Sequence, residues 1–159
     1  MKITIVCAGK LKKGYFKEGI EDYKKRLSRF CTAEIREVDD EKTPQNASEA
    51  EENEIRRKEG MRLLAAIPKD SYVVTLEIKG RMLSSEQMAD RIRTLTLSGV
   101  SSISFVIGGS LGLAPEVIQR ADAHLSFSSM TFPHQLMRLI LMEQIYRSFK
   151  IIRNEPYHK

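Results

Sequence analysis

Residues Ile103 to Gly112 read ISFVIGGSLG, and this stretch decides the fold. Its first five residues are mostly β-branched or aromatic and are too few for a helix, so they predict a strand. The three glycines after the strand permit positive φ angles and a close approach of the backbone to a ligand. Because ligands of parallel sheets bind beyond the carboxyl ends of strands, the stretch predicts a strand that leads into a binding loop.

Strand and helix patterns alternate on both sides of this loop. Before it, strands are predicted at 3–8, 33–38 and 71–76, and helices at 15–30, 48–67 and 83–97. After it, a short helix opens at Pro115, a strand covers 121–127 and a long helix covers 133–152. Ser48 and Glu51 match a capping box at the start of the second helix. The alternation predicts an α/β fold, with a mostly parallel sheet and helices on both faces.

The composition is that of one globular domain, which we expect to span residues 1–159. Of the 159 residues, 42% are hydrophobic and 30% are charged, and the net charge of +5 favours a polyanionic partner such as nucleic acid. We find no apolar run that could span a bilayer and no signal peptide, so we expect a cytoplasmic protein without a membrane partner. Cys7 and Cys31 lack metal-ligand spacing, which predicts reduced core thiols and no metal.

The loop Gly108 to Gly112 also fits the G-x-S-x-G pattern of serine hydrolases. Asp122 and either His124 or His134 follow in the chain order that such a triad requires. A hydrolase elbow needs a helix immediately after its serine, whereas Leu113-Ala114-Pro115 delay the helix here. Hydrolysis is therefore the weaker alternative.

A second unusual segment, SFSSMTFPH, covers residues 126–134. Small hydroxyl residues leave backbone amides and carbonyls accessible, which suits recognition of an adenine edge and a ribose. Phe127, Met130 and Phe132 would supply apolar walls. The competing interpretation is a helix N-cap with buried aromatic residues, which the residues alone slightly favour.

The long final helix is apolar nearly all round. One face of a sheet covers only a stripe of a helix, so the remaining apolar surface predicts contact with a second subunit. We therefore expect a homodimer that uses this helix.

Four motifs taken together resemble one family. They are LEIKG at 76–80 with LSSE at 83–86, FVIGGS-x-G at 105–112, LSFSSMTFPH at 125–134, and the final YHK at 157–159. In this order the chain resembles, from its first strand to its last residue, the bacterial 23S ribosomal RNA pseudouridine N3-methyltransferases of the SPOUT superfamily.

The resemblance implies a homodimer with a trefoil knot in its C-terminal part, which binds S-adenosylmethionine. It implies methylation of N3 of pseudouridine 1915 in the 23S rRNA of the assembled ribosome. Matching the family's pattern residue by residue, the cofactor would be held by Leu76, Gly108, Phe127, Ser128, Ser129, Met130, Thr131 and Phe132. The alternative from another class is a knotted module that binds RNA or a nucleotide without chemistry.

We expect the tail after the final helix to complete the active site. Pro156 cannot continue a helix, and the polar tail has little reason to enter the core. Arg153 and His158 could ease loss of the N3 proton, and Tyr157 could stack on an extruded base. Two questions stay open: whether the tail is instead a disordered surface segment, and whether it serves its own subunit or the partner.

Overall fold

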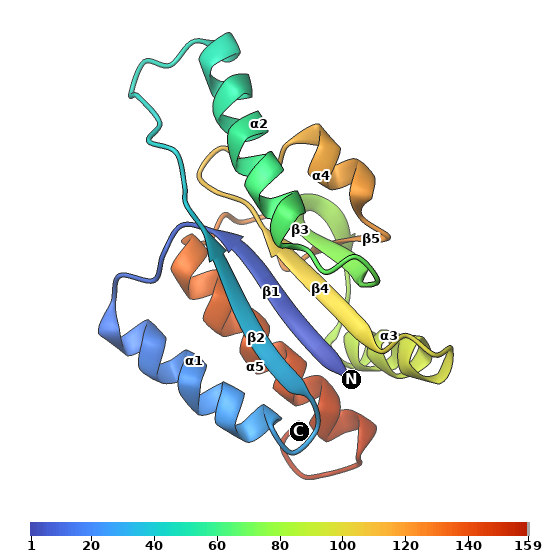
Figure 1. Ribbon diagram of the computed structural model, residues 1–159. Helices are drawn as coiled ribbons and strands as arrows, with labels where there is room; N and C mark the ends of the chain where they lie inside the picture. The colour runs from blue at the N-terminus through green and yellow to red at the C-terminus, as the bar shows by residue number, and fades with distance from the viewer. Residues whose placement is uncertain (159) are drawn as a thin grey trace.

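The computed structural model describes residues 1–158 and contains a sheet of five strands (Figure 1). The final residue of the tail motif, Lys159, lies outside the described residues. The strands are β1 (Lys2–Ala8), β2 (Thr32–Val38), β3 (Tyr72–Met82), β4 (Ser102–Ile107) and β5 (Ala123–Ser126). Their order is β2-β1-β4-β3-β5, and all four neighbouring pairs are parallel. The predicted parallel sheet is confirmed.

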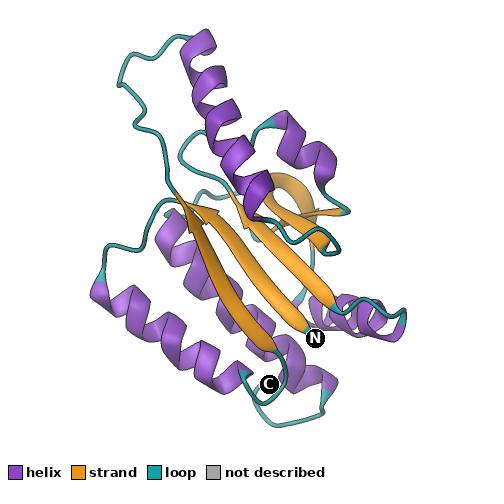
Figure 2. Cartoon of the chain, in the orientation of Figure 1, coloured by secondary structure: helices purple, strands orange, loops and turns teal. Residues whose placement is uncertain are grey.

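Five helices cover both faces of this sheet, as predicted (Figure 2). They are α1 (Gly14–Leu27), α2 (Glu49–Ala66), α3 (Ser85–Leu97), α4 (Pro115–Arg120) and α5 (His134–Ile152). One core joins Ile5 and Phe105 to α1, α3 and α5, and the other joins Val6 and Val106 to α2 and α4. Successive strand residues thus point to opposite faces. The trefoil knot stays a prediction.

The helix boundaries follow local chemistry. Ser48 Oγ accepts the Glu51 N–H at 3.3 Å and the Glu51 carboxylate accepts the Ser48 N–H at 2.7 Å, so the predicted capping box is confirmed. Ser84 and Gln87 form the same box at α3. Helix α1 ends at Leu27, three residues before the predicted end, because the next residues turn toward β2 and the N–H of Phe30 donates to Leu27.

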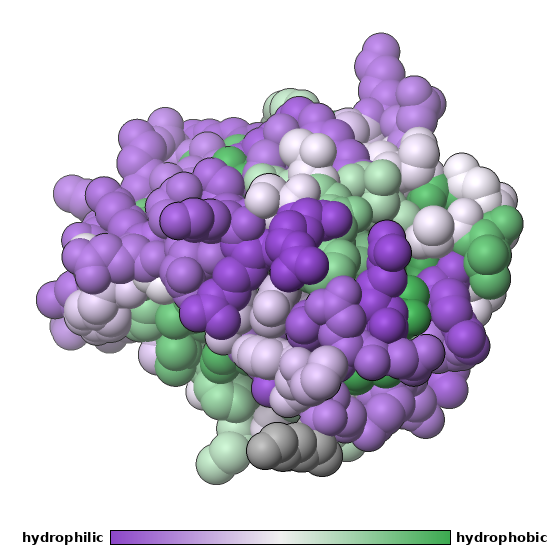
Figure 3. Space-filling model, turned by 90° about the horizontal axis from the view of Figure 1, so that it is seen from below, coloured by the Kyte–Doolittle hydropathy of each residue, from purple (hydrophilic) through white to green (hydrophobic). Residues whose placement is uncertain are grey.

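Helix α5 is covered more fully within the chain than its sequence suggests. It packs on the sheet and contacts both α1 and α3, which lie on either side of it (Figure 1). Leu136 and Ile151 remain half-buried and belong to neither core. On the face that Figure 3 shows, apolar surface lies in patches between hydrophilic side chains. The homodimer stays a prediction.

Strand β3 is longer than the predicted 71–76 and is interrupted near its carboxyl end. Leu76 and Arg81 both pair with Leu125, so the residues between them form an irregular loop within the strand. A Cβ atom on Gly80 would lie 2.6 Å from the carbonyl carbon of Leu125, so the two backbones approach closely only because residue 80 is glycine. The interruption places residues 77–80 beside β5.

Both cysteine thiols are free and buried. Burial raises the pKa of Cys7 and of Cys31 to about 11, so both are protonated core thiols at neutral pH. Within residues 1–158, no helix has the length and apolar character needed to cross a membrane.

Candidate active site

A cavity of about 600 Å³ lies where β3, β4 and β5 end. Since these strands are neighbours in a parallel sheet, the segments after them meet at one edge. The predicted residues that line the cavity are Leu76, Gly108, Phe127, Ser128, Met130, Thr131 and Phe132. Ser129 is exposed and does not line it. Three segments that are far apart in the sequence therefore form one site.

The glycine loop folds back on itself at the wall of this cavity. The Gly112 N–H donates to the Gly109 carbonyl at 3.1 Å, and Gly112 has φ +80°. A Cβ atom on Gly108 would lie 2.8 Å from the carbonyl carbon of Gly112. A side chain at position 108 would thus force the turn apart, in addition to narrowing the cavity.

A glutamate of α2 supports this loop from behind, and the sequence analysis missed it. Glu59 is 3% exposed, and its Oε1 accepts the Glu41 N–H at 3.0 Å. Among the described residues its Oε2 has no partner, and a Cβ on Gly109 would lie 2.4 Å from that oxygen. Burial raises the pKa of Glu59, and the charges of Asp40 and Glu41 add to this rise. The contact fixes the position of the loop relative to α2.

Gly60, the residue after Glu59, lets α2 approach the segment that follows the glycine loop. A Cβ on Gly60 would lie 2.7 Å from Cβ of Ala114, just beyond the glycine loop. Glycine is a poor residue for a helix interior, so its place in the middle of α2 was the available signal in the sequence.

Backbone turns rather than a helix cap shape the second predicted segment. Ser126 Oγ donates to the Ser128 carbonyl at 3.1 Å, and the Met130 N–H donates to Ser128 Oγ at 3.0 Å. Helix α5 begins at His134, its N-cap is Pro133 at the end of this segment, and no side chain caps it. Of the competing interpretation, the structure therefore lacks the side-chain cap but has the partly buried aromatic residues Phe127 and Phe132. Met130, 72% exposed, stands at the rim of the cavity.

The first turns of α5 add a histidine and a buried arginine. His134 lines the cavity, and burial followed by the charge of Arg138 lowers its pKa, which favours the neutral imidazole. Arg138 is 1% exposed and donates to Glu37 at 2.9 Å and to the carbonyls of Ala8 and Gly9 at 2.8 and 2.7 Å. These bonds tie the start of α5 to the carboxyl ends of β1 and β2. Sequence reasoning did not identify Arg138.

The tail packs on α5 instead of lining its own cavity. The ring of Tyr157 meets Tyr146 edge-on at 4.9 Å between centroids, Arg147 lies over it at 4.7 Å, and its hydroxyl donates to Glu143 at 3.1 Å. Burial raises the pKa of Tyr157, and hydrogen bonds to Tyr23 and Glu143 raise it further. The phenol therefore stays protonated at neutral pH.

The other two predicted catalytic residues are also away from the cavity. His158 Nε2 lies 2.7 Å from Glu86 Oε1, and Arg153 is exposed at the C-cap of α5. The pKa of Glu86 is lowered to about 2 by its hydrogen bonds, first with Ser84 and then with its own backbone and His158. Within one chain, the structure does not bring Arg153, Tyr157 or His158 to the cavity.

The residues of the hydrolase pattern do not form a triad. Ser110 Oγ lies 3.3 Å from Thr43 Oγ1, and the next helix begins only at Pro115. His124 Nδ1 bonds to Glu77 at 2.6 Å, and the Asp122 carboxylate accepts the Val73 N–H at 2.7 Å. In the part of the chain that the structure describes, no three His, Cys, Asp or Glu side chains are grouped to hold a metal ion.

Comparison with known proteins gives a family match. A family model described as predicted SPOUT methyltransferase matches residues 1–158. The proteins named ribosomal RNA large subunit methyltransferase H from Clostridium novyi (strain NT) and from Carboxydothermus hydrogenoformans are each 57% identical over 159 residues, which is all of both chains.

A solved structure of a probable methylase family protein from Haemophilus influenzae Rd KW20 shares the fold, with a TM-score of 0.57 and 14% identity. The match covers 99% of this chain and 70% of that one. With three strand-end segments meeting in one cavity and a family match over residues 1–158, the chain belongs to the SPOUT methyltransferase family.

Proposed function

We propose that the chain transfers a methyl group from S-adenosylmethionine to N3 of pseudouridine 1915 in the 23S rRNA of the assembled ribosome. Full-length relatives at 57% identity carry the name ribosomal RNA large subunit methyltransferase H, and this is the observation that carries the proposal. A ribosomal substrate supports a cytoplasmic location for the reaction. The net charge of +5 suits an RNA partner.

The residues around the cavity fit the proposed cofactor. Leu76, Phe127 and Phe132 offer apolar walls for a purine ring, while the glycine loop and the turn at Ser128 offer backbone groups for its polar edges. Thr131 adds a hydroxyl. When bound, S-adenosylmethionine supplies an activated methyl group on a positively charged sulfur.

The protein residues would align the acceptor base and assist the loss of its N3 proton. Methyl transfer is an in-line displacement, so most of the acceleration comes from positioning and from exclusion of water. Met130 at the rim could cover the site. The N3 proton must leave, and a nearby cation or imidazole would stabilise the resulting anion. Arg153 and His158 remain our candidates for this role, and Tyr157 for stacking on the base.

We infer that these three tail residues act in the cavity of a second copy. The tail does not line its own cavity, and its contacts hold it along α5, which is the helix that we propose as the dimer interface. A homodimer would bring each tail close to the partner's cavity. We therefore propose that the tail acts in trans.

Two measurements test the proposed function. Calorimetry should detect S-adenosylmethionine binding, and incubation with the labelled cofactor and undermethylated ribosomes should place one methyl group at pseudouridine 1915, mapped by mass spectrometry of rRNA fragments. Cofactor binding without transfer would support the non-catalytic binding module. Absence of cofactor binding would contradict the proposed function.

A further inference from the structure

A second hollow lies beside the cofactor cavity, between α3 and the strands β3 and β5. We call it the α3 groove, and its volume is about 1240 Å³. Apolar side chains, all buried, make its floor: Val74, Met88, Ile92, Leu95, Phe105 and Leu125. It shares Glu77, Lys79 and Leu125 with the cofactor cavity. The two hollows are therefore neighbours across the interrupted end of β3.

The acidic side chains at the rim of the α3 groove are already paired. Each carboxylate contacts a basic group: Glu77 with His124 at 2.6 Å, Glu86 with His158 at 2.7 Å, and Asp90 with Arg93 at 2.5 Å. Of the three, only Asp90 is paired with a permanent cation, because the histidines beside Glu77 and Glu86 carry charge only when protonated.

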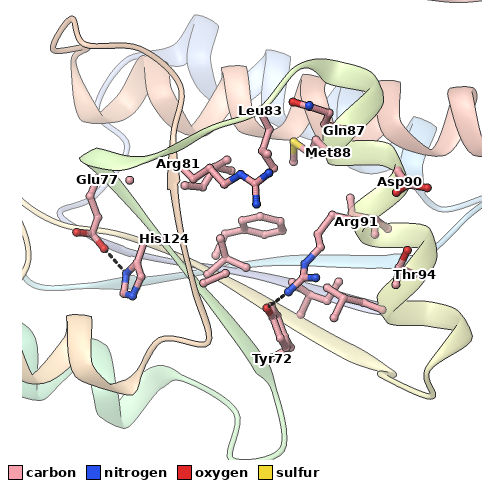
Figure 4. A pocket seen from close by; sticks show the side chains of 18 of the residues that line it. Tyr72, Glu77, Arg81, Leu83, Gln87, Met88, Asp90, Arg91, Thr94 and His124 are labelled. Atoms are coloured by element: carbon pink, nitrogen blue, oxygen red, sulfur yellow. Dashed lines mark hydrogen bonds and ion pairs between the residues drawn. The ribbon is translucent and has the colours of Figure 1, made fainter.

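The cationic side chains of the rim are not paired in this way. Within residues 1–158, neither Lys79 nor Arg81 forms an ion pair, and both are exposed. Arg91 donates to the hydroxyl of Tyr72 at 2.6 Å and lies 5.6 Å from the centre of that ring, without a carboxylate partner in the same residues. Figure 4 shows Arg81 and Arg91 reaching toward the cavity from β3 and α3. Among the described residues, the cations of this rim that have no carboxylate partner are therefore Lys79, Arg81 and Arg91.

An apolar floor under a cationic rim matches one kind of ligand chemistry, a flat ring that carries a phosphate. Single-stranded RNA combines both, since its bases stack on apolar and aromatic side chains and its phosphates pair with arginine. Building on the proposed function, we propose that the α3 groove binds a nucleotide next to the target base in the substrate RNA. Arg81 and Arg91 would contact its phosphates, and the wall shared with the cofactor cavity would set its distance from the methyl donor.

The first test removes the two arginines. Arg81→Ala/Arg91→Ala should raise KM for ribosomes by about tenfold and reduce the slope of log affinity against log salt by about 1.4, the value for two phosphate contacts on a single strand. The Kd for S-adenosylmethionine should stay within about twofold of wild type, because neither arginine lines the cofactor cavity. Lys17→Ala/Lys25→Ala is the control, since it removes the same charge from α1.

The outcomes separate this proposal from the proposed function. If wild type methylates ribosomes and the arginine variant matches the lysine control in KM and salt slope, the groove does not bind RNA. If the arginine variant changes from dimer to monomer in light scattering, the groove is a subunit interface and the proposal is wrong. A wild type that does not methylate ribosomes contradicts the proposed function itself.

The second test leaves the protein unchanged. Ribosomes carrying 4-thiouridine beside the target should cross-link on irradiation to peptides of β3 or α3 that contain Tyr72, Arg81 or Arg91, identified by mass spectrometry. Cross-links confined to peptides outside the groove would overturn the proposal even if the arginine variant folds poorly.

Discussion

Glu59 and Gly60 shape the site without lining it. Glu59 places an unpartnered carboxylate oxygen behind Gly109, and Gly60 lets α2 lie against Ala114. Both contact the region of the loop that forms the cavity wall, so substitutions in α2 should alter cofactor binding through packing.

Glu59→Gln should make stability less dependent on pH. Folding raises the pKa of Glu59, so the stabilisation linked to this group is fully present below the unfolded pKa and is lost as pH rises through the folded pKa. Glutamine does not titrate, so the unfolding free energy of the variant minus that of wild type should grow as pH rises above the unfolded pKa of glutamate, about 4.3. Urea denaturation measures it. Glu18→Gln, an exposed change on α1, is the control, and a difference that is constant with pH would contradict the prediction.

Gly60→Ala should destabilise the protein despite favouring the helix. Alanine in a helix interior gains about 1 kcal/mol over glycine, while a forced contact in a packed core costs about 1–3 kcal/mol. Because the new Cβ would lie 2.7 Å from Cβ of Ala114, the steric cost should exceed the gain in helix propensity. We expect the unfolding free energy to fall by about 1 kcal/mol and cofactor binding to weaken. Gly14→Ala, where nothing lies within 4 Å, should be neutral or stabilising by the same denaturation assay. Equal effects at both positions would rule out the clash.

At the scale of elements, the start of α2 depends on its cap. Ser48→Ala removes the side-chain acceptor of the Glu51 N–H and should cost about 1 kcal/mol of unfolding free energy. Ser101→Ala, an exposed serine outside any helix, should change it by less than about 0.5 kcal/mol. Thermal or urea unfolding distinguishes the two. If both variants match wild type, the capping box does not contribute to stability.

The tail is the element whose role is easiest to isolate. Deleting residues 157–159 should leave the affinity for S-adenosylmethionine within about twofold, because Tyr157 and His158 do not line the cavity, but should abolish methylation of ribosomes. Tyr157→Phe keeps the aromatic ring and loses the hydroxyl bonds to Glu143 and Tyr23, so it should keep most of the activity. Full methylation by the deletion variant would show that the tail has no role in methyl transfer.

At the scale of the whole molecule, we predict that α5 forms the contact between subunits. Leu136 on α5 is half-buried and packs into neither core, so Leu136→Glu should place a charge in the proposed interface and dissociate the dimer. Light scattering should then change from twice 18.2 kDa to 18.2 kDa, with a parallel loss of methylation. Leu97→Glu, at an apolar side chain that is 82% exposed on α3, should stay dimeric. Dissociation by Leu97→Glu alone would locate the interface on α3 instead.

The sequence by itself determined the features that depend on neighbouring residues. The capping box at Ser48, the strand that ends at Ile107 and the glycine turn after it are set by hydrogen bonds and backbone angles over a few positions. Alternation of strands and helices then implied the parallel sheet, and a parallel sheet gathers its strand ends at one edge. In the structure Leu76, Gly108 and Phe127, which the family resemblance implies as cofactor residues, line one cavity at that edge.

Only the tertiary structure decided the features that depend on contacts between distant segments. The sequence has no local sign that Glu59 lies behind Gly109, that Gly80 meets the backbone of Leu125, or that the tail packs on α5 away from its own cavity. The apolar circumference of α5 also did not reveal that α1 and α3 cover much of it. Burial, close approach and pairing depend on which surfaces the folded chain brings together, and a linear pattern records only what each residue prefers.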